Sequence, residues 1–264
     1  MRKYLLVAKN TWDEYMQYRL NFVMWRVRNV LRLIIVYFLW YAIFNQRGEL
    51  FGYNESQILT YILLSSIVAS IVFSTKTQDI GEEINSGNLS NLLIKPISVF
   101  KYWMARDLGD KLLNIAFSIV EVFVLIIFFK PPLFFQTNPI FIFLFILGIG
   151  FSLAIYFLIS ILIGFFGFWT PDVWGPRFLF YIFLEFFAGS LFPLDILPKP
   201  VFSTLQLLPF NYLLYFPVKI YLGQLSILSI FEGFFVGLVW IIVLYLFTNK
   251  VWFKGLKSYG AYGR

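Results

Sequence analysis

Residues 139–168 read PIFIFLFILGIGFSLAIYFLISILIGFFGF and contain no charged side chain. In a helix, about 20 apolar residues cross the roughly 30 Å of hydrocarbon in a bilayer. Helices and closed barrels span membranes because only they satisfy all their backbone hydrogen bonds without water. This stretch therefore predicts a transmembrane helix of an integral membrane protein.

Similar apolar runs lie on both sides of this stretch. Only 13% of the 264 residues are charged, whereas soluble domains are about 25% charged. No linker or low-complexity block divides the chain. We expect an all-α integral membrane protein with a single domain, residues 1–264, and six transmembrane helices. The predicted spans are residues 27–44, 57–74, 108–129, 139–168, 177–192 and 228–248.

The composition excludes several classes of chemistry. The chain has no histidine and no cysteine, so it has no His general base, Cys nucleophile, haem, iron–sulfur or zinc site. It has no glycine-rich Walker loop either, so we expect no ATP hydrolysis by this chain alone. We therefore predict a non-catalytic chain without cofactor or metal. The net charge of +7 fits loop anchors of a membrane protein better than binding of nucleic acid.

The first 24 residues differ from a signal peptide because they lack an apolar core and carry Asp13 and Glu14. Aromatic and apolar residues recur there at helical spacing, which predicts an amphipathic helix at the membrane interface, residues 1–24. The first span then begins with three arginines, whose side chains we expect to reach lipid headgroups. These are Arg26, Arg28 and Arg32.

The distribution of basic residues orients the predicted spans. Six spans put both termini on one side, and the connections on that side hold 17 Lys and Arg residues against 4 on the other. Cytoplasmic loops carry the excess of such residues. We therefore expect both termini in the cytoplasm of a bacterial cell, with the chain in the cytoplasmic membrane.

Two connections between spans stand out. Residues 75–106 form a long polar cytoplasmic segment, large enough to dock a partner. Residues 193–224 are apolar but interrupted by prolines, through which a helix cannot continue. We interpret this outer segment as short helices that enter the membrane part-way and return, with their backbone sheltered by protein. Pro193, Pro198 and Pro209 are among these prolines.

Three acidic residues fall within the predicted spans, namely Glu121, Glu185 and Glu232. A charge in the middle of a bilayer costs about 2.5–3.5 kcal/mol, so such residues usually face a protein interior or a water-filled path. We predict that they line a substrate cavity. The alternative is that each is protonated or bonded to a neighbouring helix without a role in transport.

Two further groups of acids lie near the cytoplasmic segment: Asp79, Glu82 and Glu83, and the pair Asp107 and Asp110. A magnesium site would need a substrate phosphate and a second acidic cluster, and no second Asp-rich motif is present. The remaining interpretations of the first group are a solvated helix face and a docking surface for a partner protein.

Gly233 and Gly237 form a GxxxG pair in the last predicted span. Such a pair lets two helices approach closely. We consider it a candidate interface between subunits, with packing inside the chain as the alternative.

The arrangement resembles the membrane subunit of an ATP-binding-cassette (ABC) transporter of the type-2 exporter permease class. Two local motifs carry the resemblance, together with the order of the spans. Residues 84–97 read INSGNLSNLLIKPI, similar to the "G-x-L, then L-x-x-P" stretch of such permeases. Residues 189–194 read GSLFPL and are followed by Leu197-Pro198 and by Leu208-Pro209-Phe210, similar to their connection between the fifth and sixth spans.

The resemblance implies a half-transporter that pairs with a second permease and binds two copies of a separate ATPase subunit, which holds ATP and magnesium. It also implies that the helix around residues 79–93 is a coupling helix that docks on the ATPase. Asp79, Glu82, Glu83, Gly87 and Leu89 belong to this region. Gly87 would end the helix in a left-handed conformation. The outer hairpin would act as a lid, with Pro193, Pro198 and Pro209 as its candidate residues.

The substrate and two alternative functions remain open at this point. Because Glu121 and Glu185 would make the interior acidic, we expect a hydrophobic cation or a lipid-like molecule as the exported substrate. One alternative is an ion-coupled secondary transporter with the buried glutamates as relay, which would favour inverted repeats that we do not find. The other is a membrane-embedded lipid transferase, which would need paired metal motifs or a catalytic histidine.

Overall fold

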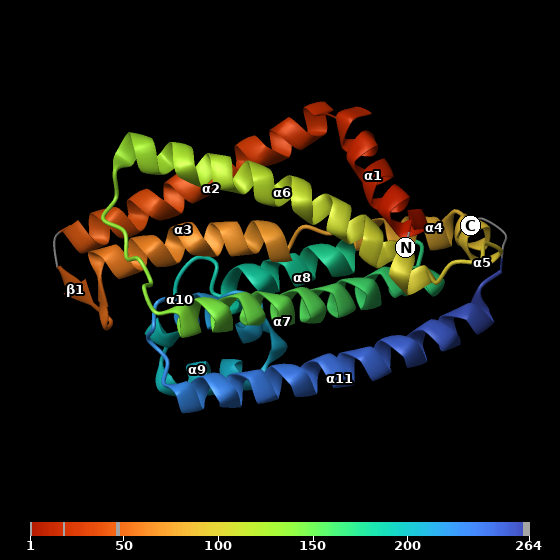
Figure 1. The fold of residues 1–264 in the computed structure, drawn as a ribbon. Helices are drawn as coiled ribbons and strands as arrows, with labels where there is room; N and C mark the ends of the chain where they lie inside the picture. The colour runs from red at the N-terminus through yellow and green to blue at the C-terminus, as the bar shows by residue number, and fades with distance from the viewer. Residues whose placement is uncertain (1, 18, 46–47, 261–264) are drawn as a thin grey trace.

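The computed structural model describes residues 2–17, 19–45 and 48–260 and is almost entirely helical (Figure 1). In chain order its elements are α1 (Arg2–Gln17), α2 (Arg19–Asn45), β1 (Glu49–Leu50), β2 (Tyr53–Asn54), α3 (Glu55–Val72), η1 (Thr77–Asp79), α4 (Ile80–Asn85), α5 (Leu89–Leu93), α6 (Val99–Phe129), α7 (Pro139–Gly164), η2 (Phe165–Phe168), α8 (Trp174–Phe187), η3 (Leu194–Ile196), α9 (Lys199–Leu207), η4 (Pro209–Tyr212), α10 (Tyr215–Tyr221) and α11 (Ile227–Ser258).

In the described part of the chain, 5 helical segments are long and apolar enough to cross a membrane. They coincide with five of the six predicted spans and lie in α2, α3, α6, α7 and α11. The remaining predicted span, residues 177–192, corresponds to α8, which has 14 residues and ends at Phe187. At 1.5 Å per residue, α8 is only about 21 Å long. The count of six spans therefore stays a prediction.

The two ends of the helical bundle differ in what they carry (Figure 1). The start of α1, the end of α11 and the short helices α4 and α5 gather at one end. The β1–β2 hairpin, α9 and α10 lie at the opposite end. This arrangement agrees with a chain whose first and last helices reach the same side of the membrane. We call the first end the α4 end and the other the hairpin end.

The first helix ends at Gln17, and α2 begins at Arg19, so the change of helix comes earlier than the predicted boundary at residue 24. Helix α1 packs on α6. The Trp12 indole Nε1 donates a hydrogen bond of 2.6 Å to the carbonyl oxygen of Gly109. A Cβ atom on Gly109 would lie 2.5 Å from the backbone oxygen of Ala8, so only glycine permits this close approach. The side chains of Leu5 and Leu6 remain exposed, as expected for a helix with one face toward lipid.

The outer segment 193–224 folds into short helices whose starts are set by its prolines. Pro193 caps η3, Pro198 caps α9, and Pro209 is the first residue of η4. Proline suits these positions because its missing N–H is not needed in a first helical turn. Helix α10, at the end of the segment, is buried against α3 and α7. The backbone of this part is therefore sheltered by protein, whereas its depth in a membrane stays a prediction.

A buried polar network ties the outer segment to β2. The Lys219 ammonium on α10 lies 2.8 Å from a carboxylate oxygen of Asp195 and donates to the Tyr53 hydroxyl at 2.8 Å and to Gln224 at 2.6 Å. The Tyr53 hydroxyl in turn donates to Asp195 at 2.9 Å. Because every member has a partner, the network holds the hairpin end together without an uncompensated buried charge.

Candidate functional site

A cavity of about 490 Å³ lies among α2, α3, α6, α7 and α8. We call it the arginine cavity, because four arginines but only two acidic side chains line it. These six residues are Arg26, Arg28, Arg32, Arg177, Asp110 and Glu121. Aromatic and apolar side chains complete its wall, among them Trp25, Trp174, Leu33, Ile62 and Phe180.

Glu121 lies in the wall of the arginine cavity, and its charge is matched by Arg26. The Arg26 Nε donates to one carboxylate oxygen at 2.7 Å, and a terminal guanidinium nitrogen donates to the other. The remaining donors of Arg26 reach Asn114 and Ser70 at 3.2 Å and Ser118 at 3.4 Å. This fork-shaped pairing joins α2 to α6. Arg26 is one of the three arginines that we expected to reach lipid headgroups, and it binds a carboxylate inside the protein instead.

Glu185 is paired in the same way, with Arg32 of α2. The hydroxyl of Ser190 lies 2.9 Å from the Glu185 carbonyl oxygen, to which it donates. Glu185 itself is not part of the cavity wall, while Arg32 is. Glu232 is exposed near the start of α11 and lies outside the cavity. The structure thus brings Glu121 and Glu185 near the same cavity through their arginines and leaves Glu232 apart.

These pairings correct the expected charge of the cavity. We expected an acidic interior suited to a hydrophobic cation. Four arginines face two acids in the wall, and even with Glu185 counted beside Arg32 the positive charges are in excess. A cation would meet this excess, and Asp110, the wall acid that forms no ion pair among the described residues, is already bonded to Tyr15 and Asn114. The sequence signal that was missed is the spacing of Arg26, Arg28 and Arg32, which places basic groups along one part of α2.

The polar face of α6 continues from Glu121 toward the α4 end. Asp107 accepts hydrogen bonds of 2.8 Å from the Thr75 hydroxyl and from the backbone N–H of Lys76. Asp110 is bonded to Tyr15 of α1 and to Asn114. These two acids therefore join α6 to neighbouring segments. Within residues 2–17, 19–45 and 48–260, no group of three acidic side chains is arranged to hold a metal ion.

At the α4 end, the predicted coupling acids take different places. Asp79 and Glu83 lie 3.3 Å and 3.5 Å from the Arg106 guanidinium, which also binds Glu14 of α1 at 2.7 Å. Burial raises the pKa of Asp79 and of Glu83 above their ordinary values, and the nearby cations only partly offset this rise. Glu82, in contrast, is exposed. Among the three predicted coupling acids, Glu82 is therefore the one whose side chain is exposed.

Gly87 and Leu89 connect α4 to α5. Gly87 has a φ of +81° just after the end of α4, which confirms the expected left-handed conformation. Leu89 is 1% exposed and packs in a core with Trp103 and Trp252. It therefore positions α5 against α6 and α11 and presents no surface for docking.

Helix α4 is packed tightly on the end of α7 and on η2. A Cβ on Gly167 would lie 2.8 Å from the backbone oxygen of Gly81, and one on Gly164 would lie 2.9 Å from the Cβ of Ile80. Contacts of this kind leave little room for α4 to slide along α7 and η2. A displacement of α4 must therefore move the end of α7 as well.

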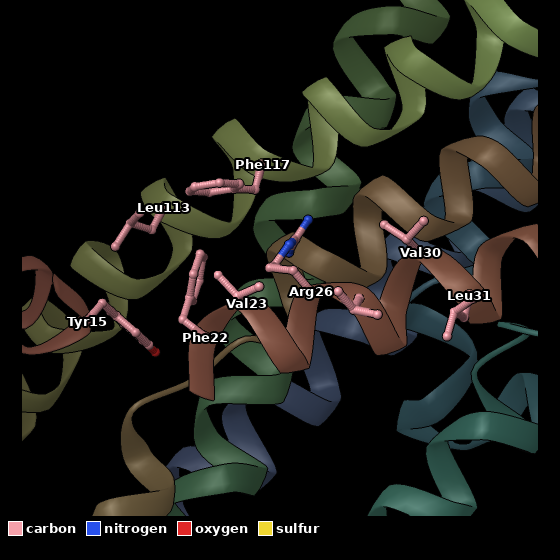
Figure 2. Close-up of a pocket in the computed structure, with 9 residues that line it drawn as sticks. Tyr15, Phe22, Val23, Arg26, Val30, Leu31, Leu113 and Phe117 are labelled. Atoms are coloured by element: carbon pink, nitrogen blue, oxygen red, sulfur yellow. The ribbon is translucent and has the colours of Figure 1, made fainter. Parts of the chain in front are cut away.

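A second cavity, the lateral pocket, has a volume of about 460 Å³ and lies between α1, α2 and α6. Figure 2 shows Phe22 and Phe117 within it, with ring centres 4.9 Å apart. Its other lining residues are almost all apolar, such as Val23, Leu31 and Leu113. Tyr15, Phe22 and Arg26 line both cavities. The lateral pocket and the arginine cavity therefore share a wall.

The GxxxG glycines pack inside the chain. A Cβ on Gly233 would overlap the ring of Phe216 in α10, and one on Gly237 would lie 3.1 Å from the ring of Phe151 in α7. Both glycines are buried in this single chain. The structure thus corrects the candidate subunit interface in favour of the intrachain alternative.

Comparison with protein families agrees with the resemblance seen in the sequence. The family model described as "ABC-2 family transporter protein" matches residues 30–263. No curated protein matches the chain. The matched range extends from the fourth turn of α2 past the end of α11, so it includes most of the arginine cavity, the α4 end and the outer segment, but only four of the nine residues that line the lateral pocket. The chain belongs to the ABC-2 family of transporter proteins.

Proposed function

We propose that the chain is the membrane-spanning subunit of an ATP-driven exporter, in which a separate ATPase moves α4 and thereby changes access to the arginine cavity. One observation carries the proposal. Phe73, Ser74, Thr75 and Gln78 line the cavity and lead directly into α4. A displacement of α4 would therefore displace these wall residues, which directly precede it in the chain. The family membership supports a transport role and an ABC ATPase partner.

The α4 end offers the surface that the ATPase would contact. Glu82 is exposed on α4, and Ile94, directly after α5, is 83% exposed. The same end holds the Arg106 cluster, defined as Glu14, Asp79, Glu83 and Arg106, which joins α1, α4 and α6. This cluster would transmit a movement of α4 to α1 and α6, and the glycine contacts would transmit it to α7. Two ATPase copies and a second permease would complete the transporter.

The proposal includes a location and a direction. Both ends of the chain and α4 would face the cytoplasm of a bacterial cell, in agreement with the excess of Lys and Arg on that side. An amphipathic substrate would enter the arginine cavity from the inner leaflet. The cavity would then open toward the hairpin end, where the segment 193–224 would act as the lid, by a rearrangement of packed helices.

The two alternative functions find less support in the structure. An ion-coupled transporter would use Glu121 and Glu185 as relays, but each carboxylate is held by an arginine. A lipid transferase would need metal-binding acids, whereas Asp107 and Asp110 are both bonded within the chain. Neither alternative explains why the cavity wall continues into α4.

We expect Glu82→Lys to weaken the binding of the ATPase by about tenfold, which corresponds to about 1.4 kcal/mol. The reason is that Glu82 is exposed at the α4 end and forms no ion pair among the described residues. Glu83 is unsuitable for this test, because its reversal would break its contact with Arg106. The measurement is the amount of ATPase that co-purifies with the tagged chain in mild detergent, followed over a range of ATPase concentrations.

Glu49→Lys provides the matched control, since Glu49 is also exposed but lies on β1 at the hairpin end. It should leave the ATPase binding unchanged. Equal binding by the wild type and by the Glu82 variant would show that α4 does not dock the ATPase. Failure of any ATPase to co-purify with the wild-type chain would count against the transporter subunit itself.

A further inference from the structure

Two arginines of the arginine cavity have no carboxylate partner among the described residues, namely Arg28 and Arg177. Arg28 donates to the Tyr181 hydroxyl at 2.8 Å, and its guanidinium lies 4.2 Å from the centre of the Trp25 ring. Arg177 donates to the Ser160 hydroxyl at 3.2 Å and to the Thr77 carbonyl oxygen at 3.3 Å. All of these partners are neutral. A guanidinium has five N–H donors, so both residues retain donors and a positive charge for a further ligand.

The two unmatched arginines face the same cavity from two helices. Arg28 lies on α2 and Arg177 on α8. Tyr181, the partner of Arg28, follows Arg177 by four residues and therefore lies on the same face of α8. The ion pair between Arg32 and Glu185 links the same two helices further along. Arg28 is thus bonded, through Tyr181, to the helix that carries Arg177.

The cavity is amphipathic. Arg28 is the tenth of the 27 residues of α2, and Arg177 lies in the first turn of α8, whereas apolar wall residues occupy later turns of these helices. Leu33, Val36 and Leu184 belong to this later part, where the charge of Arg32 is matched by Glu185. Each helix therefore passes from a zone with an unmatched arginine into one whose charges are matched. This arrangement suits a ligand with negative charge at one end and an apolar body at the other.

We propose that the arginine cavity binds an anionic amphiphile, with its phosphate, sulfate or carboxylate headgroup between Arg28 and Arg177 and its apolar tail along Leu33, Val36 and Leu184. This inference rests on the proposed function, for which it names the substrate class. Arginine suits such a headgroup because its fork of donors matches two oxygens at once. The headgroup belongs either to a transported amphiphile or to a resident membrane lipid, and both share this chemistry.

The test uses the full chain in nanodiscs of phosphatidylcholine, without the ATPase. Tryptophan fluorescence is followed while dodecyl phosphate is added, because Trp25 and Trp174 line the cavity. We expect saturable binding of dodecyl phosphate. Arg28→Gln and Arg177→Gln should each weaken it by about tenfold. Arg28→Lys, which keeps the charge but loses the fork of donors, should fall between the wild type and Arg28→Gln.

Lys254→Gln is the matched control, because Lys254 is exposed on α11 and lies outside the cavity. It removes the same charge and should leave the affinity unchanged. A thermal unfolding midpoint like that of the wild type, measured for each variant, shows that weaker binding reflects the lost arginine and not a misfolded chain. Arg177→Lys serves as a second variant if Arg177→Gln unfolds.

Three further ligands separate the possible outcomes. Dodecyltrimethylammonium binding as tightly as dodecyl phosphate would overturn the proposal, and so would inorganic phosphate binding as tightly without a tail. Competition by phosphatidylglycerol in the nanodisc would support the headgroup site and assign it to a resident lipid. Unchanged affinity in both glutamine variants would overturn the site. None of these results depends on the ATPase. The co-purification experiment therefore tests the proposed transporter function separately from this ligand site.

Discussion

Replacement of Arg26 by leucine is expected to lower the free energy of unfolding by about 3–5 kcal/mol. The Arg26 side chain is 7% exposed and that of Glu121 is 18% exposed. Without Arg26, the carboxylate of Glu121 must lose its charge or remain buried without a partner, and Asn114 and Ser118 lose a donor. The measurement is equilibrium unfolding of the purified chain in detergent, with the thermal midpoint as a second reading.

The double variant Arg26→Leu with Glu121→Leu separates the pair from its surroundings. It removes both charges, and replacing a buried ion pair by apolar groups is often close to neutral. We therefore expect it to be more stable than either single variant. Arg32→Leu is the comparison at a more exposed pair, where the arginine side chain is 32% exposed, and it should cost less than Arg26→Leu. A double variant as unstable as the sum of the single ones would mean that the two residues do not act as a pair.

The apolar spans could be predicted from the sequence because the membrane dictates their length and composition. The stretch 139–168 is a continuous helix and 3₁₀ turn, α7 and η2, and four other predicted spans also coincide with long helices. Their ends were less accurate. Helix α2 begins at Arg19, well before the predicted start at residue 27, because residues 20–25, LNFVMW, are mostly apolar and extend the same helix.

The pairing of charges could not be predicted, because it depends on which helices are neighbours. Arg26 and Glu121 are separated by 95 residues, and Arg32 and Glu185 by 153. The sequence shows two buried acids and a group of arginines, but no periodicity relates them. The expected acidic cavity followed from counting the acids alone. Side chains of α2 reach Glu121 on α6 and Glu185 on α8, and the arginines that α2 brings reverse the sign of the charge that a substrate would meet.

The coupling segment illustrates the limit set by short helices. Gly87 was predicted correctly, since a left-handed residue after a helix is a local requirement of the backbone. The faces of α4 and α5 were not, because 6 and 5 residues are too few for a periodic pattern to show which side is buried. Only the tertiary contacts separate Glu82, which is exposed, from Glu83, which binds Arg106.

The GxxxG pair shows that one motif serves two kinds of packing. In a membrane, small residues allow close contact both between subunits and between helices of one chain. Here the partner of Gly233 is the ring of Phe216 on α10. Because α10 ends the outer segment 193–224, this contact fixes that segment to α11. Gly233 therefore helps to hold the hairpin end closed, and the proposed transport cycle would have to open this end.

Gly233→Ala is expected to destabilise the chain by about 1–3 kcal/mol, because the added methyl group overlaps the Phe216 ring in a well-packed region. Gly237→Ala should cost less, since its Cβ would lie 3.1 Å from the Phe151 ring, a smaller overlap than that of Gly233 with Phe216. Gly150→Ala on α7 is the matched control: no atom lies within 4 Å of its added Cβ, so the higher helix propensity of alanine should leave stability unchanged or raised.

Thermal unfolding and light scattering on the same samples check these results together. A loss of dimer with an unchanged unfolding midpoint in Gly233→Ala would instead place the glycine between subunits, whereas a lower midpoint at constant oligomeric state would show that it holds α10 and α11 together within one chain.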